Sequence, residues 1–200
     1  MESPQIVEAS LDDSSLPAPL IAGFERAELG PSFHYSGDVG LASRSPLVSI
    51  IGTREPSTFS LTAVEAVASQ LGLAGGVVIS GAARGTDMAA HKAALESGGA
   101  TIGCLPQGMQ KINWKSWRPE LLSGLQEEMV LLLSPFHKAQ AITRQTPVIR
   151  NRLIASLADA VVVGEAKLLS GTHTCTRIAA GMKVPIFFLK DLSEEAEDSE

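Results

Sequence analysis

The chain has 200 residues, of which 44% are hydrophobic and 19% are charged, and this composition suits one globular domain with its own core. No apolar run approaches the roughly 20 residues of a membrane span, and the acidic start lacks the basic and apolar regions of a signal peptide, so we expect a cytoplasmic protein. Cys104 and Cys175 have no CxxC partner, which argues against a disulfide or a metal site.

The formal net charge of −6 hides an uneven distribution. Residues 1–20 carry four acidic residues and residues 191–200 carry six, and neither stretch has a base. We expect both ends to be disordered acidic tails, or tails that compete with an anionic ligand for a basic groove. Residues 21–190 have a net charge of +4 and are expected to form a single domain.

Short apolar runs with little alternation predict parallel strands that are covered on both faces. These runs lie at residues 46–52, 75–81, 100–106, 129–134, 160–166 and 184–189. Helical patterns separate them, at residues 60–72, 86–97, 117–127, 149–157 and 174–181. Residues 21–45 are expected to form an irregular lead-in, because Gly, Pro and Ser interrupt any long element there.

The alternation of strands and helices predicts an α/β fold with three layers, in which a doubly wound, mostly parallel sheet of the Rossmann-like type is central. In such sheets, ligands bind outside the carboxyl ends of the strands. Four polar clusters of the sequence follow predicted strands, so each is a candidate for part of a binding site.

The first cluster is IIGTREPS, residues 50–57. Gly52 allows a tight turn at the strand end, and Thr53 and Arg54 then project over the edge of the sheet. The planar guanidinium of Arg54 suits a phosphate, although a solvated surface turn could have the same sequence.

The second cluster, ISGAARGTDMAAH, follows the next strand. Its glycines permit close approach of the backbone, and the free N–H groups of residues 81–85 favour an anion. Arg84 and Asp87 would contact a ligand, or Arg84 is only solvated and Asp87 only caps the helix. His91 is expected to bond a backbone carbonyl or Asp87. The candidate site residues are Ser80, Gly81, Arg84, Gly85 and Asp87.

The third cluster is TRQTPVIRNR, which precedes the strand at 160–166 and contains Arg144 and Asn151. Arg150 and Arg152 project roughly 200° apart on a helix, so both cannot face one ligand. One of them is expected to face the ligand, and the other is expected to pair with an internal carboxylate. The carboxylates considered are Asp87, Asp159 and Glu165.

The fourth cluster, SGTHTCT, places Ser170, Gly171 and Thr172 at the start of a helix. Like the Ser-Gly pair at residues 80–81, this turn of small residues precedes a helix N-terminus that favours an anion. In the last strand, at residues 184–189, the two phenylalanines belong to the core or to an edge that pairs across a dimer.

The motifs IIGTREPS, VVISGAARGTDMAAHKAALESGGATIGCLPQGM and RNRLIASLADAVVVGEAKLLSGTHTCTRIAAGMKVPIFFL resemble the Rossmann-like core of the DNA-processing protein A (DprA/Smf) family. The resemblance covers roughly residues 45–189. It implies a cytoplasmic bacterial protein that binds single-stranded DNA, forms a homodimer and helps to load a RecA-type recombinase during natural transformation. It implies neither catalysis nor a cofactor.

The family's strand-end Gly-Ser-Arg matches residues 52–54, and the resemblance implies that this arginine contacts DNA phosphate. Ser-Gly-x-Ala-x-Gly-x-Asp matches residues 80–87, Arg-Asn-Arg matches residues 150–152, and the Ser-Gly turn matches residues 170–171. Arg144 takes the place of a basic residue six positions before Arg-Asn-Arg.

Two departures from the family pattern stand out. The family's usual base-stacking aromatic is Pro147 here, which predicts weakened or rearranged DNA contacts. The chain has no room for the helical domain and the winged-helix-like domain that flank this core in many members, so we expect a core-only or divergent member.

The leading hypothesis is a single-stranded DNA-binding protein whose affinity comes from phosphate contacts. The alternative is a protein that binds or senses a mononucleotide, as LOG-like proteins of the same broad superfamily do. Their Pro-Gly-Gly-x-Gly-Thr signature and downstream glutamate are absent from this sequence, which disfavours hydrolysis. We therefore expect a binding protein without a metal, a cofactor or a membrane partner.

Overall fold

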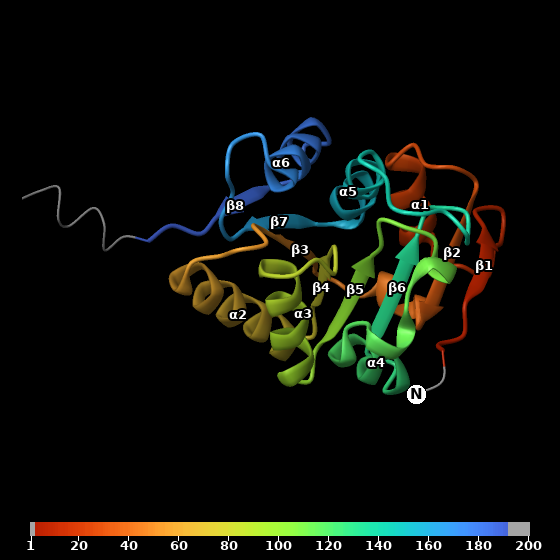
Figure 1. Ribbon diagram of the computed structural model, residues 1–200, viewed down its shortest axis with the longest axis horizontal. Coiled ribbons are helices and arrows are strands. Elements are labelled where there is room, and N and C mark those ends of the chain that lie inside the picture. Colours follow the sequence, from red (N-terminus) through yellow and green to blue (C-terminus); the bar gives the residue numbers. More distant parts are fainter. Residues whose placement is uncertain (1–2, 192–200) are drawn as a thin grey trace, which may run out of the picture.

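A single sheet of eight strands forms the central layer of the molecule in the computed structural model, which describes residues 3–191 (Figure 1). The strands are β1 (Val7–Ser10), β2 (Ser32–Gly37), β3 (Leu47–Ile51), β4 (Val77–Ser80), β5 (Ala100–Cys104), β6 (Val130–Ser134), β7 (Ala160–Val163) and β8 (Ile186–Phe188). Their order in the sheet is β1-β2-β6-β5-β4-β3-β7-β8. The strands from β6 to β8 are parallel, whereas β1 and β2 pair in antiparallel fashion at one edge.

The strand order reverses next to β3. The chain adds β4, β5 and β6 on one side of this strand and then returns to add β7 and β8 on the other side. The loops that follow β3 and β7 therefore diverge at the carboxyl edge of the sheet. Such a reversal is where open α/β sheets form their ligand-binding crevice.

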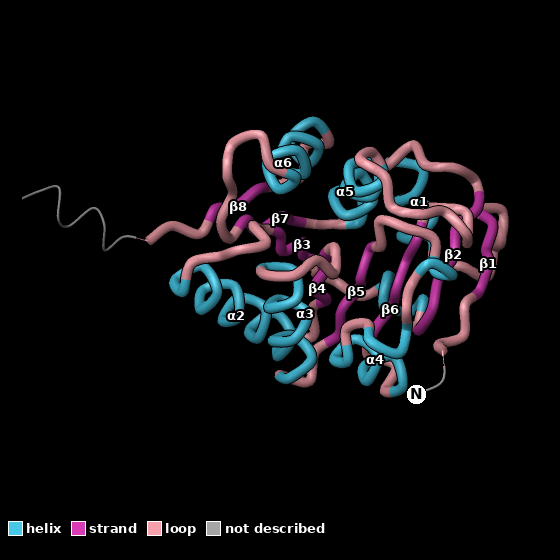
Figure 2. Tube along the Cα trace, viewed as in Figure 1, coloured by secondary structure: helices cyan, strands magenta, loops and turns pink. Residues whose placement is uncertain are grey.

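Helices cover both faces of the sheet, as the tube drawing shows (Figure 2). One face carries α2 (Thr58–Leu73), α3 (Thr86–Glu96) and α4 (Pro119–Gln126), and the other carries α1 (Ala18–Arg26), α5 (Thr146–Leu157) and α6 (Gly171–Gly181). Short 3-10 helices lie in the connections, namely η1 (Val39–Ser43), η2 (Met109–Lys111) and η3 (Trp114–Ser116).

Local sequence sets several of the helix starts. The hydroxyls of Ser57 and Ser170 accept hydrogen bonds from backbone N–H groups three residues on, which caps α2 and α6. Pro119 and Pro147 lie in the first turns of α4 and α5, where the missing N–H of proline costs no helical hydrogen bond.

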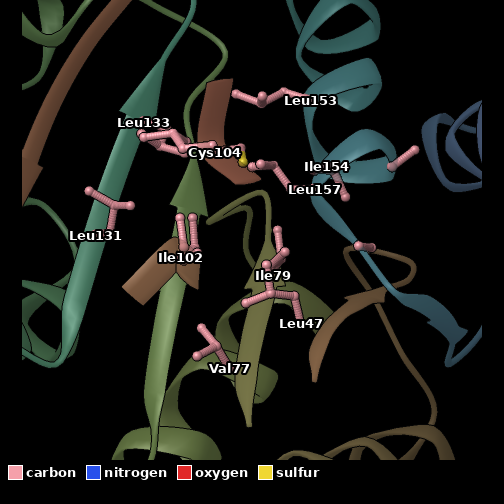
Figure 3. Close-up of a cluster of buried hydrophobic side chains, with 14 of the residues drawn as sticks. Leu47, Val77, Ile79, Ile102, Cys104, Leu131, Leu133, Leu153, Ile154 and Leu157 are labelled. Atoms are coloured by element: carbon pink, nitrogen blue, oxygen red, sulfur yellow. The ribbon is translucent and has the colours of Figure 1, made fainter. Parts of the chain in front are cut away.

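The core forms because the parallel strands are apolar on both faces. Every residue of β4, β5 and β6 is buried. Alternate strand residues such as Ile79, Ile102 and Leu131 share one face, on which Leu153 and Leu157 of α5 pack (Figure 3). The intervening residues pack under the helices of the opposite face.

This architecture confirms the predicted α/β fold with a mostly parallel, doubly wound sheet between two helical layers. The six predicted strands and the five predicted helices are all present, with ends that differ by a few residues. No helix within residues 3–191 is both long and apolar enough to cross a membrane.

The predictions of a disordered tail at residues 1–20 and an irregular lead-in at residues 21–45 are wrong for the described part, residues 3–45. This part of the chain supplies β1, α1, β2 and η1. Leu20 and Phe24 of α1 are fully buried, and the ring of Phe24 stacks on Phe33 of β2 at a centroid distance of 4.3 Å. The acidic residues misled the prediction because Glu8, Asp12 and Asp13 lie on the exposed side of a strand and in a turn.

The body therefore begins before residue 20. The predicted acidic tail at residues 191–200 lies outside the described residues, except for Asp191.

Candidate nucleic-acid interface

All four polar clusters of the sequence contribute to one cleft of about 460 Å³, which we call the central cleft. It lies at the ends of β3 and β7, where the strand order reverses. Its place agrees with the rule for open α/β sheets. The predicted site residues that line it are Gly52, Thr53, Arg54, Arg84, Asp87, Arg150, Asn151, Ser170, Gly171 and Thr172.

The loop after β3 is fixed between its two neighbours. The backbone N–H of Thr53 donates to the carbonyl of Glu165 at 2.8 Å, and the backbone N–H of Thr86 donates to the carbonyl of Thr53 at 3.2 Å. A Cβ atom at Gly52 would collide with the side chain of Thr86, so a larger residue there would push these loops apart. The pinned loop presents Arg54, whose side chain is exposed and forms no ion pair with any carboxylate of residues 3–191.

The loop after β4 is organised by Asp87. Its Oδ2 atom accepts hydrogen bonds from the backbone N–H groups of Gly81 at 3.2 Å and Ala83 at 3.3 Å. Burial raises the pKa of Asp87, and the charge of Arg150 together with the hydrogen bonds opposes this rise. The expectation that the N–H groups of residues 81–85 face an anion is therefore wrong for two of them, because an internal carboxylate already occupies those donors.

Ser80 also has an internal role. It is fully buried, and its hydroxyl donates to the carbonyl of Ile50 at 2.6 Å. This bond joins the ends of β4 and β3. The sequence analysis placed Ser80 among the ligand-binding residues, and the structure places it beneath that surface.

Arg84 is exposed at the mouth of the central cleft. Its Nη2 lies 2.6 Å from Oε1 of Glu55, which lines the same cleft. Both side chains are about two thirds exposed, at 67% and 71%. Exposed pairs of this kind contribute roughly 0–1 kcal/mol, so a phosphate can compete with Glu55 for this cation.

Arg150 and Arg152 point to different sides of α5, as the helical geometry requires. Arg150 is buried, and its Nη1 donates to the carbonyl of Cys104 at the end of β5 at 2.7 Å. A Cβ atom at Gly81 would overlap the guanidinium, so the glycine makes room for it. Arg152 instead pairs with Glu28, on the far side from the cleft.

The expectation that only one of the two arginines faces the ligand left open which one; Arg150 lines the cleft, and Arg152 is the one that pairs with a carboxylate. The carboxylate that pairs with Arg152 is none of the three expected partners, because Glu28 belongs to the region that was expected to be irregular.

The start of α6 forms the opposite wall of the central cleft. Asn151 of α5 donates from Nδ2 to the carbonyl of Gly171 at 3.2 Å and so holds the two helices together. Ser170 caps the helix by accepting from the N–H of His173 at 3.2 Å. The positive end of the α6 dipole consequently faces the cleft, where it favours an anion.

Two further predicted residues lie beside this cleft rather than in its lining. Gly85 has a φ of +82° and packs on the backbone of Arg54, where a side chain would clash. Arg144 is exposed in the segment before α5 and lines neither the central cleft nor its neighbour.

A second cleft, which the sequence analysis missed, adjoins the first. We call it the Trp117 cleft; its volume is about 390 Å³, and Gly81 lies in its lining. It shares Arg54, Ala83, Arg84, Pro147 and Arg150 with the central cleft. The signal was the Trp-Arg pair in KSWRPE, which the prediction assigned to a helix that begins only at Pro119.

Neither cysteine nor His91 offers reactive chemistry. Burial raises the pKa of the Cys104 and Cys175 thiols to about 12. His91 bonds Thr101 Oγ1 through Nδ1 at 2.5 Å, not a carbonyl or Asp87 as expected, and burial lowers its pKa to about 3. Among residues 3–191, no three His, Cys, Asp or Glu side chains gather as metal ligands would.

Comparison with known proteins agrees with the motifs. The model of the family DNA recombination-mediator protein A matches residues 12–199. DNA processing protein DprA of Streptococcus pneumoniae is 35% identical over 148 residues, which are 72% of this chain and 50% of that protein. Protein Smf of Escherichia coli is 31% identical over 142 residues, which are 71% of this chain and 38% of that protein. The chain thus spans half or less of the length of these relatives.

Solved structures show the same fold. The X-ray structure of Streptococcus pneumoniae DprA has a TM-score of 0.75 at 29% identity, over 95% of this chain and 65% of that one. DprA of Helicobacter pylori, whose structure concerns its mode of binding single-stranded DNA, has a TM-score of 0.79 at 26% identity, over 100% of this chain and 91% of that one. With its motifs, fold and sequence in agreement, the chain belongs to the DNA recombination-mediator protein A family.

Proposed function

We propose that this protein binds single-stranded DNA along the carboxyl edge of its sheet, with the phosphates in the central cleft. The observation that carries the proposal is the convergence of Arg54, Arg84, Arg150 and the α6 N-terminus on that one cleft. The Helicobacter pylori relative, which is similar over the whole chain, binds single-stranded DNA.

The groups of the cleft differ in what they can give a phosphate. Arg54 is exposed and forms no ion pair within residues 3–191, so its guanidinium fork is available to a phosphate. Arg84 becomes available to a phosphate when its ion pair with Glu55 breaks. Arg150 is held by the Cys104 carbonyl and contributes a fixed positive charge from below. These groups contact phosphates along the strand and do not discriminate between bases.

We further infer that DNA binding serves DNA processing in recombination or transformation and that the protein is a binding protein rather than an enzyme. A second copy of the chain and a RecA-type recombinase are the proposed protein partners. Arg144 stays a proposed outer contact, because it is exposed on the segment that leads into α5.

The test is a titration of labelled oligo-dT, followed by fluorescence anisotropy at 50 mM and 200 mM salt. Binding should weaken steeply with salt, because each neutralised phosphate of a single strand contributes about −0.7 to the log–log slope. Arg54→Ala should weaken binding about tenfold and remove about 0.7 from the slope.

Arg44→Ala is the matched control for this titration, because Arg44 is also exposed but precedes β3 and so lies at the opposite end of that strand. The control should bind like the wild type. Equal binding by wild type and Arg54→Ala would refute the site, and no binding at low salt would refute the function.

A second candidate function is the binding of a mononucleotide. The observation in its favour is that the two adjoining clefts have volumes of about 460 and 390 Å³, a size that suits small molecules. A thermal-shift comparison decides between the two. A rise in Tm with a mononucleotide and none with an oligonucleotide would favour the sensor.

A further inference from the structure

We propose that the Trp117 cleft is a nucleobase pocket, in which the ring of Trp117 stacks on one base of the bound strand. This inference rests on the proposed function, because it places a base next to phosphates in the central cleft. It adds a part of the site that contacts the base and not the backbone.

The first argument is the chemistry of the walls. Leu105, Pro106, Ile112 and Ile142 give the cleft apolar surface, and Ile142 is 57% exposed despite being hydrophobic. Trp117 is the aromatic residue of the lining, and it is only half-buried. Every base has a π-face, so an aromatic ring on an apolar wall suits a base of any identity.

The second argument is that Trp117 is held in place before any ligand arrives. Its ring meets the ring of Trp114 edge-on, with a centroid distance of 5.3 Å and an interplanar angle of 75°. Trp114 is itself 8% exposed and belongs to the hydrophobic cluster under this part of the sheet. A rigid aromatic anchor loses little conformational entropy on binding.

The third argument comes from Arg118, the next residue. Its φ of +24° is a strained conformation for a residue with a side chain. Its Nε donates to the carbonyl of Ala82 at 3.2 Å, which ties the Trp117 segment to the loop after β4. The strain and the tie together fix the Trp117 segment against the loop that carries Arg84.

The fourth argument is the connection between the clefts. Arg54 and Arg84 line both. A phosphate bound to these two cations therefore lies at the shared boundary, and its own base is only one sugar away. The cationic boundary and the apolar pocket match the two halves of a nucleotide.

The experiment compares two ligands of equal length, an oligo-dT and a strand of abasic deoxyribose phosphates, by anisotropy at low salt. Wild type should bind oligo-dT roughly five- to a hundredfold more tightly than the abasic strand, which is the range for stacking of one base. Trp117→Ala should bring this preference close to one and leave the affinity for the abasic strand unchanged.

Two further variants keep the test sound if Trp117→Ala folds poorly. Trp117→Phe keeps an aromatic ring and should retain affinity within about threefold, while the quenching of tryptophan fluorescence by oligo-dT is lost. Ile142→Asp places a charge at an exposed position of the pocket and should lower the preference for oligo-dT without changing Tm.

The outcomes separate the two proposals. If wild type binds both strands equally, or if Trp117→Ala and Ile142→Asp keep the full preference, the base pocket is refuted and phosphate binding stands. If wild type binds neither strand at low salt, the proposed function fails, and the base pocket fails with it.

Discussion

The charged residues at the carboxyl edge of the sheet form two layers, a buried one that stabilises the fold and an exposed one that is available to a ligand. In the inner layer, Asp87 and Arg150 are buried and bond to the backbone at the strand ends. In the outer layer, Arg54, Arg84 and Glu55 are exposed, and Arg84 forms an ion pair with Glu55. The sequence motifs mix the two layers, since Arg84 and Asp87 are only three residues apart. The comparison teaches that substitutions in the inner layer should cost folding and those in the outer layer should change binding.

The largest expected effect is on stability, from Asp87→Ala. The change removes the acceptor for two backbone N–H groups and the negative charge beside the buried Arg150. We expect a loss of about 3–5 kcal/mol in the free energy of unfolding, measured by urea denaturation. Asp87→Asn keeps an acceptor oxygen and should lose less. A wild-type midpoint for Asp87→Ala would contradict the inner-layer assignment.

The next effect is a pH dependence from His91, a buried residue of α3. Burial lowers its pKa to about 3, whereas the unfolded chain takes up this proton near pH 6.5. The unfolded state thus binds more protons in this window, so the stability is present above pH 6.5 and is lost as the pH falls towards 3.

Between pH 7 and pH 4, the free energy of unfolding, measured by urea denaturation, should fall by about 3 kcal/mol more for wild type than for His91→Gln. The raised pKa of Asp87 acts in the opposite direction, and it is common to both proteins. The exposed His137→Gln serves as control and should keep the wild-type slope. Parallel slopes for wild type and His91→Gln would show that this histidine is not the cause.

In the outer layer, Glu55→Gln should tighten binding of oligo-dT. The change frees Arg84 from its ion pair and removes a negative charge from the central cleft. The gain should be about two- to threefold at low salt, which is the scale of an exposed pair. Glu96→Gln breaks the exposed pair with Lys92 on α3 and provides the matched control. Weaker binding by Glu55→Gln would mean that the carboxylate itself contacts the ligand.

The smallest expected effect is that of Arg152→Ala. Because this arginine pairs with Glu28 and lines neither cleft, its removal should leave the affinity for oligo-dT within twofold of wild type. The same titration measures it. A tenfold loss of affinity would show that Arg152 contacts DNA and that both sides of α5 take part in binding.

Much of the fold could be predicted from the sequence, because the parallel strands are short apolar runs that alternate with longer helix-forming stretches. The location of the central cleft followed from the rule about strand ends. The assignment of individual side chains did not follow. Ser80 and Arg152 share their motifs with residues that do line a cleft, and only the tertiary contacts with Ile50 and Glu28 separate them.

The Trp117 cleft escaped prediction for a different reason. Its wall combines a loop after β5, the segment before α4 and the segment before α5, which are distant in the sequence. The Trp-Arg pair of the second segment is visible in the sequence, but the sequence does not show that the three segments meet. A pocket of this kind becomes visible only when the packing of Trp117 against Trp114 is known.

The segment before residue 30 contains none of the predicted site residues, yet it holds the outer helices in place. Gly23 of α1 lies directly against Leu157 of α5, and Arg26 donates to the Met182 carbonyl just after α6. A shortened protein that kept only the motif-bearing region from β3 onward would uncover the apolar side of α5 that packs on α1. Such a truncation should precipitate on expression, so fusion partners and purification tags are better joined to an intact N-terminal segment.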